Sequence, residues 1–265
     1  MTQAERDAAY NNGAAVANSA ELNAQRRAAS AAHRAAHPGR LDIPYGEKPR
    51  QKWDFYPATD APAPCLVFIH GGYWQMNGRE DFAVLAAGVA AHGWSVAMPG
   101  YTLAPEASLR DIVDEIFAAL NWLQANRATA GIFGTIILSG WSAGAHLAAL
   151  AMAHPSVSAA LLISGVYELG PIKETYLNAK LNLTGEEVAS LSPLRLPVVQ
   201  KPAVIAYGKE ELRALADDSE RLHAARVAAG AKSILVPVEG ENHFTILHEL
   251  SSPSGLLTTQ LLQLV

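Results

Sequence analysis

Short apolar runs alternate with helical segments along most of this 265-residue chain. The runs KWDFY, CLVFI, SVAMP, TIILSG, AALLIS, PAVIAY and SILVPV occupy residues 52–56, 65–69, 95–99, 135–140, 159–164, 202–207 and 233–238. Helical patterns lie at residues 82–92, 109–126, 143–154 and 217–230. Apolar strands separated by helices of about 10–15 residues are typical of βαβ units. The alternation therefore predicts an α/β fold with a mainly parallel central sheet and helices on both faces.

Two further segments stand outside this alternation. Residues 14–36 are rich in Ala, Arg and Glu and precede Pro38, which predicts an N-terminal helix that stops there. Residues 165–200 carry three prolines and form an unusually long connection between two strands. We expect one domain over residues 1–265, with an N-terminal helical segment at 1–40 and a lid-like insertion at 165–200.

The composition gives no sign of a nucleic acid or membrane partner. Half of the residues are hydrophobic, 17% are charged, and the net charge of −5 comes from interspersed residues of both signs. No apolar run approaches the roughly 18 residues that a membrane span needs, and the first residues lack a secretory pattern. Cys65 is the only cysteine and lies in an apolar run, which predicts a buried thiol. We expect a cytoplasmic protein with a small-molecule partner and no metal or cofactor; a homodimer is compatible with the sequence.

The segment Gly140-Trp141-Ser142-Ala143-Gly144 joins an apolar run to an alanine-rich helical pattern. Small residues on both sides of a serine allow the sharp strand-to-helix turn called a nucleophile elbow. A helix that begins at such a turn directs its N-terminal N–H groups toward developing negative charge. This context predicts that Ser142 is a nucleophile.

A serine nucleophile needs a base, and His243 is the best-placed histidine. It lies in the loop GENHF after the last apolar run, where its side chain can reach the carboxyl edge of the sheet. We expect His146, on the elbow helix, to pack structurally, His70 to brace the loop that contains it, and His248 to lie on the surface. The remaining histidines have no strand end within reach and are expected at the surface; they are His33, His37, His92, His154 and His223.

The acid that orients the histidine should follow the apolar run at residues 202–207. Glu211 lies three residues after Gly208 and is the preferred candidate, with Glu210 as the alternative. Asp217 and Asp218 fall at the expected start of a helix, where acidic residues cap the N-terminus.

An acyl-transfer site also needs donors for the oxyanion. Gly71 and Gly72 follow the run CLVFI, and glycines allow backbone N–H groups to approach a substrate closely. The N–H of Ala143, directly after the expected nucleophile, is the second donor. Five aromatic residues flank these segments and are candidates for an aromatic pocket or for the core: Tyr73, Trp74, Trp141, Tyr167 and Phe244.

Taken together, these segments resemble the arylformamidase (kynurenine formamidase) branch of the α/β-hydrolases, a relative of the hormone-sensitive-lipase type esterases. The resemblance extends over nearly the whole chain from about Tyr10. It rests on YGEKPRQKWDFYP, FIHGGYWQ, YTLAPEASL, GWSAGAHLAA, LISGVYEL and ENHFTILHEL. It implies the α/β-hydrolase fold, a triad of Ser142, Glu211 and His243, and oxyanion glycines at Gly71 and Gly72.

The resemblance also implies a reaction. Members of this branch hydrolyse a small N-formyl arylamine such as N-formylkynurenine, giving formate and the free aromatic amine. Two positions depart from the family pattern: Trp141 replaces a usual histidine, which bears on the substrate, and Glu211 stands where aspartate is common, which bears on the acid. The alternatives are a carboxylesterase of short acyl esters and a catalytically silent small-molecule receptor on the same fold.

Overall fold

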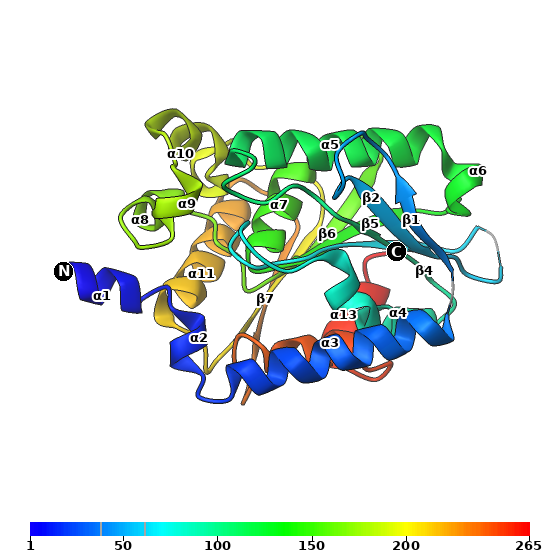
Figure 1. Cartoon of the computed structure of the whole chain (residues 1–265), viewed down its shortest axis with the longest axis horizontal. Helices are drawn as coiled ribbons and strands as arrows, with labels where there is room; N and C mark the ends of the chain where they lie inside the picture. The colour runs from blue at the N-terminus through cyan, green and yellow to red at the C-terminus, as the bar shows by residue number, and fades with distance from the viewer. Residues whose placement is uncertain (38, 61) are drawn as a thin grey trace.

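A computed structural model of the chain describes residues 1–37, 39–60 and 62–265, and its centre is an eight-stranded sheet (Figure 1). The strands are β1 (Arg40–Pro44), β2 (Lys52–Tyr56), β3 (Cys65–Ile69), β4 (Ser95–Pro99), β5 (Ile136–Trp141), β6 (Val157–Ile163), β7 (Ala203–Gly208) and β8 (Ser233–Val238). Their order is β1-β2-β4-β3-β5-β6-β7-β8, and every pair from β4 to β8 in this order is parallel. Strands β1 and β2 extend the sheet in antiparallel fashion. The predicted α/β fold is therefore confirmed, and β1 is an addition that the apolar pattern did not indicate.

Helices cover both faces of the sheet (Figure 1). One face carries α5 (Leu109–Ala125), α7 (Ala143–Ala151) and α11 (Arg213–Ala228), and the other carries η1 (Arg79–Leu85), α4 (Ala86–Ala90), α12 (His248–Ser251) and α13 (Leu256–Leu262). The expected helix at residues 82–92 is thus divided into the 3₁₀ turn η1 and α4. Strand β3 shows why its sequence is apolar throughout. Cys65 and Val67 point into one core and Leu66 and Phe68 into the other, so neither face meets water.

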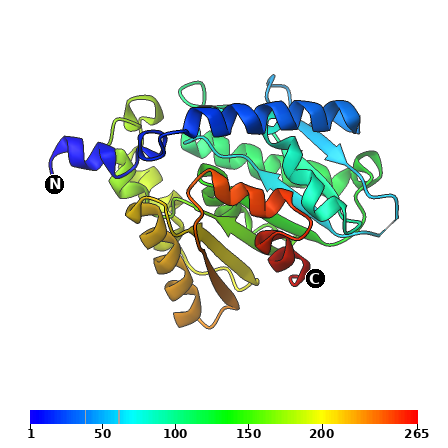
Figure 2. The ribbon, with the colours of Figure 1, turned by 90° about the horizontal axis from the view of Figure 1, so that it is seen from below.

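The N-terminal segment forms three helices, α1 (Gln3–Ala8), α2 (Asn12–Ala15) and α3 (Ser19–Ala36). Figure 2 shows α3 running lengthwise along the molecule. Ser30 Oγ on α3 donates a hydrogen bond to the backbone oxygen of Asp81 at 2.9 Å, and Arg34 forms an ion pair with the fully buried Asp54. The expected stop at Pro38 lies outside the described residues, and α3 itself ends at Ala36.

Residues 165–200 contain α8 (Leu169–Lys173), α9 (Asn178–Leu181), α10 (Gly185–Leu191) and the 3₁₀ turn η2 (Pro193–Arg195). The N-terminal segment contacts this part of the chain, because the backbone N–H of Tyr176 donates to Asp7 Oδ1 at 2.8 Å. Two short elements complete the fold, α6 (Arg127–Ala130) and η3 (Thr245–Leu247). Within the described ranges, no helix combines the length and apolarity that a membrane span requires.

Candidate active site

Ser142 occupies a sharp turn between β5 and α7. Its backbone has φ 57° and ψ −122°, a strained conformation for a residue other than glycine, and its N–H donates to the backbone oxygen of Ile163 at 2.8 Å. The flanking glycines are needed for steric reasons. A Cβ at Gly140 would lie 2.2 Å from the oxygen of Gly144, and a Cβ at Gly144 would lie 2.0 Å from the oxygen of Ile69. The turn has the geometry of a nucleophile elbow, packed directly against the end of β3.

The loop after β3 lies beside this turn. A Cβ at Gly71 would come within 2.4 Å of the backbone oxygen of Trp141 and 3.1 Å of Ser142 Cβ, so only glycine permits this approach. Gly72, Tyr73 and Trp74 then follow with φ of 122°, 48° and 59°, all in the left-handed region. Such a loop can direct backbone N–H groups toward the nucleophile, as an oxyanion site requires.

His70 stabilises this loop through contacts with Tyr101 and Gly71. Its ring stacks on Tyr101 with centroids 4.2 Å apart, and its Nδ1–H donates to the oxygen of Gly71 at 3.0 Å. The Tyr101 hydroxyl donates to the backbone oxygen of His70 at 2.8 Å. Burial lowers the pKa of His70 to about 3, so the ring is neutral at physiological pH. These contacts are those of the bracing residue that the sequence predicted.

His243 and Glu211 meet at the carboxyl edge of the sheet, in the loops after β8 and β7. The Nδ1–H of His243 donates to Glu211 Oε2 at 3.0 Å. Glu211 Oε1 accepts two further hydrogen bonds, from the Ser164 hydroxyl and from the N–H of Gly208 at 2.8 Å. The Glu211 side chain is fully buried and that of His243 is 4% exposed. The carboxylate is thus held by three donors and fixes the imidazole with Nε2 free to act as a base.

The alternative acid Glu210 is exposed to solvent, and none of the hydrogen bonds among the described residues joins its carboxylate to His243. The indole of Trp141 holds His243 from a second side: its Nε1–H donates to the backbone oxygen of His243 at 2.7 Å, and the two rings lie 4.7 Å apart. Among the hydrogen bonds of the described residues, none joins Ser142 to the His243 ring. Catalytic hydrogen bonds of this kind are often long without substrate and tighten in the complex.

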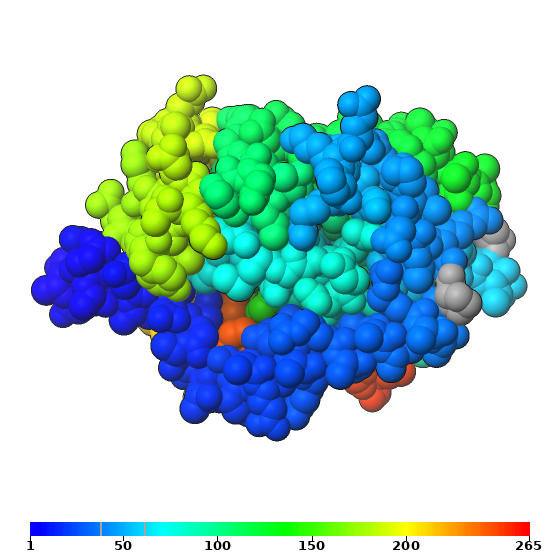
Figure 3. All heavy atoms as spheres, in the orientation of Figure 1, coloured from blue at the N-terminus to red at the C-terminus, as the bar shows by residue number. Residues whose placement is uncertain are grey.

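The site is enclosed. Ser142 is 2% exposed and His243 is 3% exposed. Figure 3 shows a small hollow bordered by the N-terminal segment (dark blue), the loop after β3 (cyan) and the α8–α9 region (yellow-green). Green and orange atoms, in the colours of the β5–α7 and β8–η3 regions, lie at its base. The N-terminal segment is therefore part of the rim of the site.

Ser164 is a site residue that the sequence reasoning missed. It directly follows β6, is fully buried with φ 51°, and its hydroxyl is one of the three donors to Glu211. Its position at the end of a strand beside β7 was the signal that could have indicated it, because the carboxyl ends of parallel strands share one edge. A second missed group is on the N-terminal segment, where buried Asn12 donates through Nδ2 to the Tyr73 hydroxyl at 3.0 Å.

The five aromatic candidates have different environments. Trp74, Trp141 and Tyr167 are almost completely buried, Tyr73 is 8% exposed, and Phe244 is partly buried. Trp141 and Phe244 contact the His243 ring, at 4.7 and 5.5 Å between centroids. Tyr73 and Trp74 belong to the loop beside Ser142, whereas Tyr167 packs in the core on the α7 side of the sheet.

Two expectations about other residues were wrong. Neither Asp217 nor Asp218 caps a helix, because α11 begins at Arg213 and both residues lie more than one turn inside it. For Asp218 the structure shows another role. Its carboxylate is buried and accepts the N–H groups of Tyr167 and Glu168 at 2.6 and 2.9 Å, and burial raises its pKa to about 6. His154 was expected at the surface but is buried. Its two ring nitrogens form hydrogen bonds with the side chains of Ser156 and Asn121.

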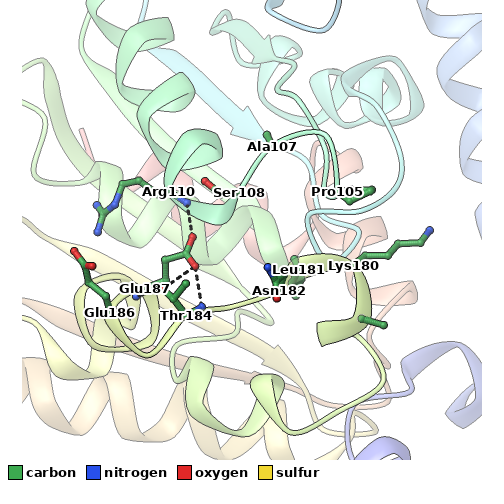
Figure 4. A pocket seen from close by; sticks show the side chains of 11 residues that line it. Pro105, Ala107, Ser108, Arg110, Lys180, Leu181, Asn182, Thr184, Glu186 and Glu187 are labelled. Carbon is green, nitrogen blue, oxygen red and sulfur yellow. Dashed lines mark hydrogen bonds between the residues drawn. The ribbon is translucent and has the colours of Figure 1, made fainter.

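His146 packs structurally, as expected: it is fully buried, and its Nε2–H donates to the oxygen of Leu191 at 2.8 Å. A cavity of about 650 Å³ lies elsewhere, between the start of α5 and the α9–α10 region (Figure 4). Its central carboxylate, Glu187, already accepts the N–H groups of Arg110 and Thr184. Within residues 1–37, 39–60 and 62–265, no three His, Cys, Asp or Glu side chains are placed to hold a metal ion.

Known proteins resemble this chain in sequence and in structure. The family described as BD-FAE matches residues 54–161. Kynurenine formamidase from Danio rerio is 31% identical over 243 residues, covering 85% of this chain and 81% of that protein. A Silicibacter sp. protein provisionally described as a thioesterase has a TM-score of 0.86 and 28% identity, covering 96% of this chain and 97% of its own. Inhibited esterase B from Lactobacillus rhamnosis has a TM-score of 0.74 at 19% identity, covering 92% and 93%, and shares the fold.

Proposed function

Since the chain belongs to the kynurenine formamidase family of α/β-hydrolases and is a hydrolase, we propose that it cleaves small N-formyl arylamines with Ser142 as the nucleophile. The products are formate and the free aromatic amine. The observation that carries the proposal is the buried His243–Glu211 pair, joined at 3.0 Å beside a serine held on a strained strand-to-helix turn.

The proposed mechanism assigns one role to each group. Ser142 Oγ attacks the formyl carbon while His243 Nε2 takes the serine proton, and Glu211 stabilises the imidazolium that forms. The N–H groups of the Gly71-Gly72 loop and of Ala143 bind the oxyanion.

His243 then returns the proton to the leaving nitrogen, and the C–N bond breaks. A water molecule, deprotonated by His243, attacks the formyl ester on the serine. The ester C–O bond breaks, His243 gives its proton to the serine oxygen, and formate leaves.

The enclosure of the site supports a small acyl group. Ser142 is almost fully buried, and the bulky residues Tyr73 and Trp74 follow the glycines of the adjacent loop directly. A formyl group carries only hydrogen on its carbonyl carbon, so it needs little room there. An arylamine is also a better leaving group than an alkylamine, because its nitrogen lone pair is delocalised into the ring.

A carboxylesterase of short acyl esters is the second candidate. It would use the same residues. The Silicibacter sp. neighbour described as a thioesterase favours it, because a thioester resembles an ester in that its leaving group is not an amine. A silent receptor on the same fold would need none of the hydrogen bonds that hold Glu211 and His243 together.

Formate release from N-formylkynurenine and formanilide by the purified protein tests the proposal. We expect turnover of both and labelling by a fluorophosphonate probe, and the loss of both signals in Ser142→Ala with an unchanged fold. Ser158→Ala, which alters an exposed serine on β6, is the matched control and should behave as the wild type. Labelling that persists in Ser142→Ala would contradict the assignment of the nucleophile.

A further inference from the structure

The loop after β3 holds a strained backbone next to the nucleophile. Gly72 has φ 122°, and Tyr73 and Trp74 follow with φ 48° and 59°, which is unfavourable for residues that carry a Cβ. Such a conformation persists only where the surrounding structure fixes it. The contacts that fix Tyr73 therefore also decide where the backbone N–H groups of this loop point.

The N-terminal segment fixes the Tyr73 side chain. The Tyr73 hydroxyl donates to the backbone oxygen of Tyr10 at 2.7 Å and accepts a hydrogen bond from Asn12 Nδ2 at 3.0 Å. All three residues are buried, and among the described residues the Tyr73 side chain has no other hydrogen-bond partner. The position of this tyrosine thus depends on a segment that lies 61 residues away in the sequence.

The direction of these hydrogen bonds defines what Asn12 contributes. A tyrosine hydroxyl has one hydrogen to donate, and the Tyr10 oxygen receives it, so Asn12 must present its NH₂ group to Tyr73. The carboxamide oxygen of Asn12 is buried and has no hydrogen-bond partner in the part of the chain that the structure describes. An unpaired buried acceptor destabilises the folded state. Stability alone therefore explains Asn12 poorly, and its one satisfied group acts on Tyr73.

The N-terminal segment is itself held by the region of α8 and α9. Asp7 Oδ1 accepts the backbone N–H of Tyr176 at 2.8 Å. The loop after β3 contacts the same region, because Gln75 Nε2 donates to the backbone oxygen of Leu177 at 2.9 Å. These three parts of the chain surround the hollow above the nucleophile (Figure 3). They are joined to one another by hydrogen bonds, so the N-terminal segment can hold the loop in a fixed position.

We propose that Asn12 is a positioning residue for catalysis, an inference that rests on the proposed function, in which this loop binds the oxyanion. Through the Tyr73 hydroxyl, the NH₂ group of Asn12 holds the backbone that follows Gly71 in the orientation that directs its N–H groups toward the oxyanion. The oxyanion forms only along the reaction path. Loss of this contact therefore weakens transition-state binding and leaves substrate binding unchanged.

The test replaces Asn12 by alanine and Tyr73 by phenylalanine, singly and together. Each single change should lower kcat for formanilide about tenfold with little change in KM, which matches one lost hydrogen bond and is less than the loss of an oxyanion donor. The double variant should lose no more than either single variant, because both changes remove the same contact. Asn18→Ala is the matched control: this exposed asparagine makes no side-chain capping hydrogen bond, so kcat should stay at the wild-type value.

Three results would overturn the proposal. A wild-type kcat with a lowered thermal midpoint in Asn12→Ala would show that the residue only anchors the segment. A raised KM with unchanged kcat would make it a substrate contact, and additive losses in the double variant would show that it does not act through Tyr73. If Asn12→Ala does not fold, Tyr73→Phe decides alone, because it removes a single oxygen atom; a wild-type kcat then refutes the positioning role.

Nitrophenyl acetate, assayed beside formanilide, separates this inference from the proposed function. Its hydrolysis also passes through an oxyanion, so kcat/KM for the ester should fall about tenfold in Asn12→Ala as well. If the wild type cleaves only the ester and Asn12→Ala shows this fall, the formamidase function fails and the positioning role stands. If the wild type cleaves neither substrate, both fail.

Discussion

Replacing Glu211 by glutamine tests how the acid holds the base. In the structure, Glu211 Oε1 accepts from the Ser164 hydroxyl and from the N–H of Gly208, and Oε2 accepts from His243 Nδ1–H. A glutamine has one acceptor oxygen and one NH₂ group. The oxygen must take the Oε1 position, because both donors there need an acceptor. The NH₂ group then faces His243 Nδ1 and favours the tautomer with its proton on Nε2, which cannot accept the serine proton.

The expected loss follows from this reversal of the tautomer. We predict that kcat for formanilide falls by about 10³- to 10⁴-fold in Glu211→Gln, or roughly 4–5.5 kcal/mol of transition-state stabilisation. The shape is conserved, so circular dichroism and the thermal midpoint should change little. Initial rates of aniline release over a range of substrate concentrations give kcat and KM separately.

Glu210→Gln is the matched control, because the neighbouring carboxylate is exposed and should not influence the rate. The reasoning is refuted if Glu211→Gln retains kcat within tenfold of the wild type. It is equally refuted if Glu210→Gln loses as much activity as Glu211→Gln.

Two further predictions concern buried polar groups. Ser164→Ala removes one donor to Glu211 and should lower kcat/KM for formanilide by about 10- to 100-fold, the range for a hydrogen bond to a charged group; an unchanged rate would exclude a positioning role. Burial raises the pKa of Asp218 to about 6 in the folded state, so protonation favours folding and the free energy of unfolding falls as pH rises from about 4 to 6. Urea titrations should show that the free energy of unfolding of Asp218→Asn falls by roughly 3 kcal/mol less over this pH range than that of the wild type. Asp217→Asn changes a partly exposed carboxylate and should keep the wild-type pH dependence. Identical pH profiles of the two variants would disprove the assignment.

The fold could be predicted because the pattern of the inner strands has a single cause. Apart from Ser158 on β6, strands β3 to β7 are buried on both faces, so their sequences are mainly apolar and easily recognised. Strand β1 escaped notice for the opposite reason. It lies at the edge of the sheet, its residues alternate between exposed and partly buried, and Asp42 within it has φ 60°.

The candidate site was predictable where topology alone decides it. Parallel strands end at one edge, so loops after β5, β7 and β8 had to converge, and the structure brings Glu211 to His243 there. Their catalytic roles remain predictions. The hydrogen bond from Ser164 to Glu211 depends on how two segments far apart in the sequence pack, and no local sequence pattern indicates it. The start of α11 was also misjudged, because this helix begins without a side-chain cap and its acidic residue Asp218 is engaged by another segment.

The most direct test of the central claim is the dependence of kcat/KM on the acyl group, since this quantity reflects differential transition-state binding. Purified protein would be assayed on formanilide and acetanilide and on nitrophenyl esters from acetyl to hexanoyl. The account predicts measurable cleavage of formanilide, at least tenfold slower cleavage of acetanilide, and a steep fall with acyl length among the esters. Equal or better turnover of butyryl and longer esters, together with no cleavage of formanilide, would contradict it and identify a general esterase.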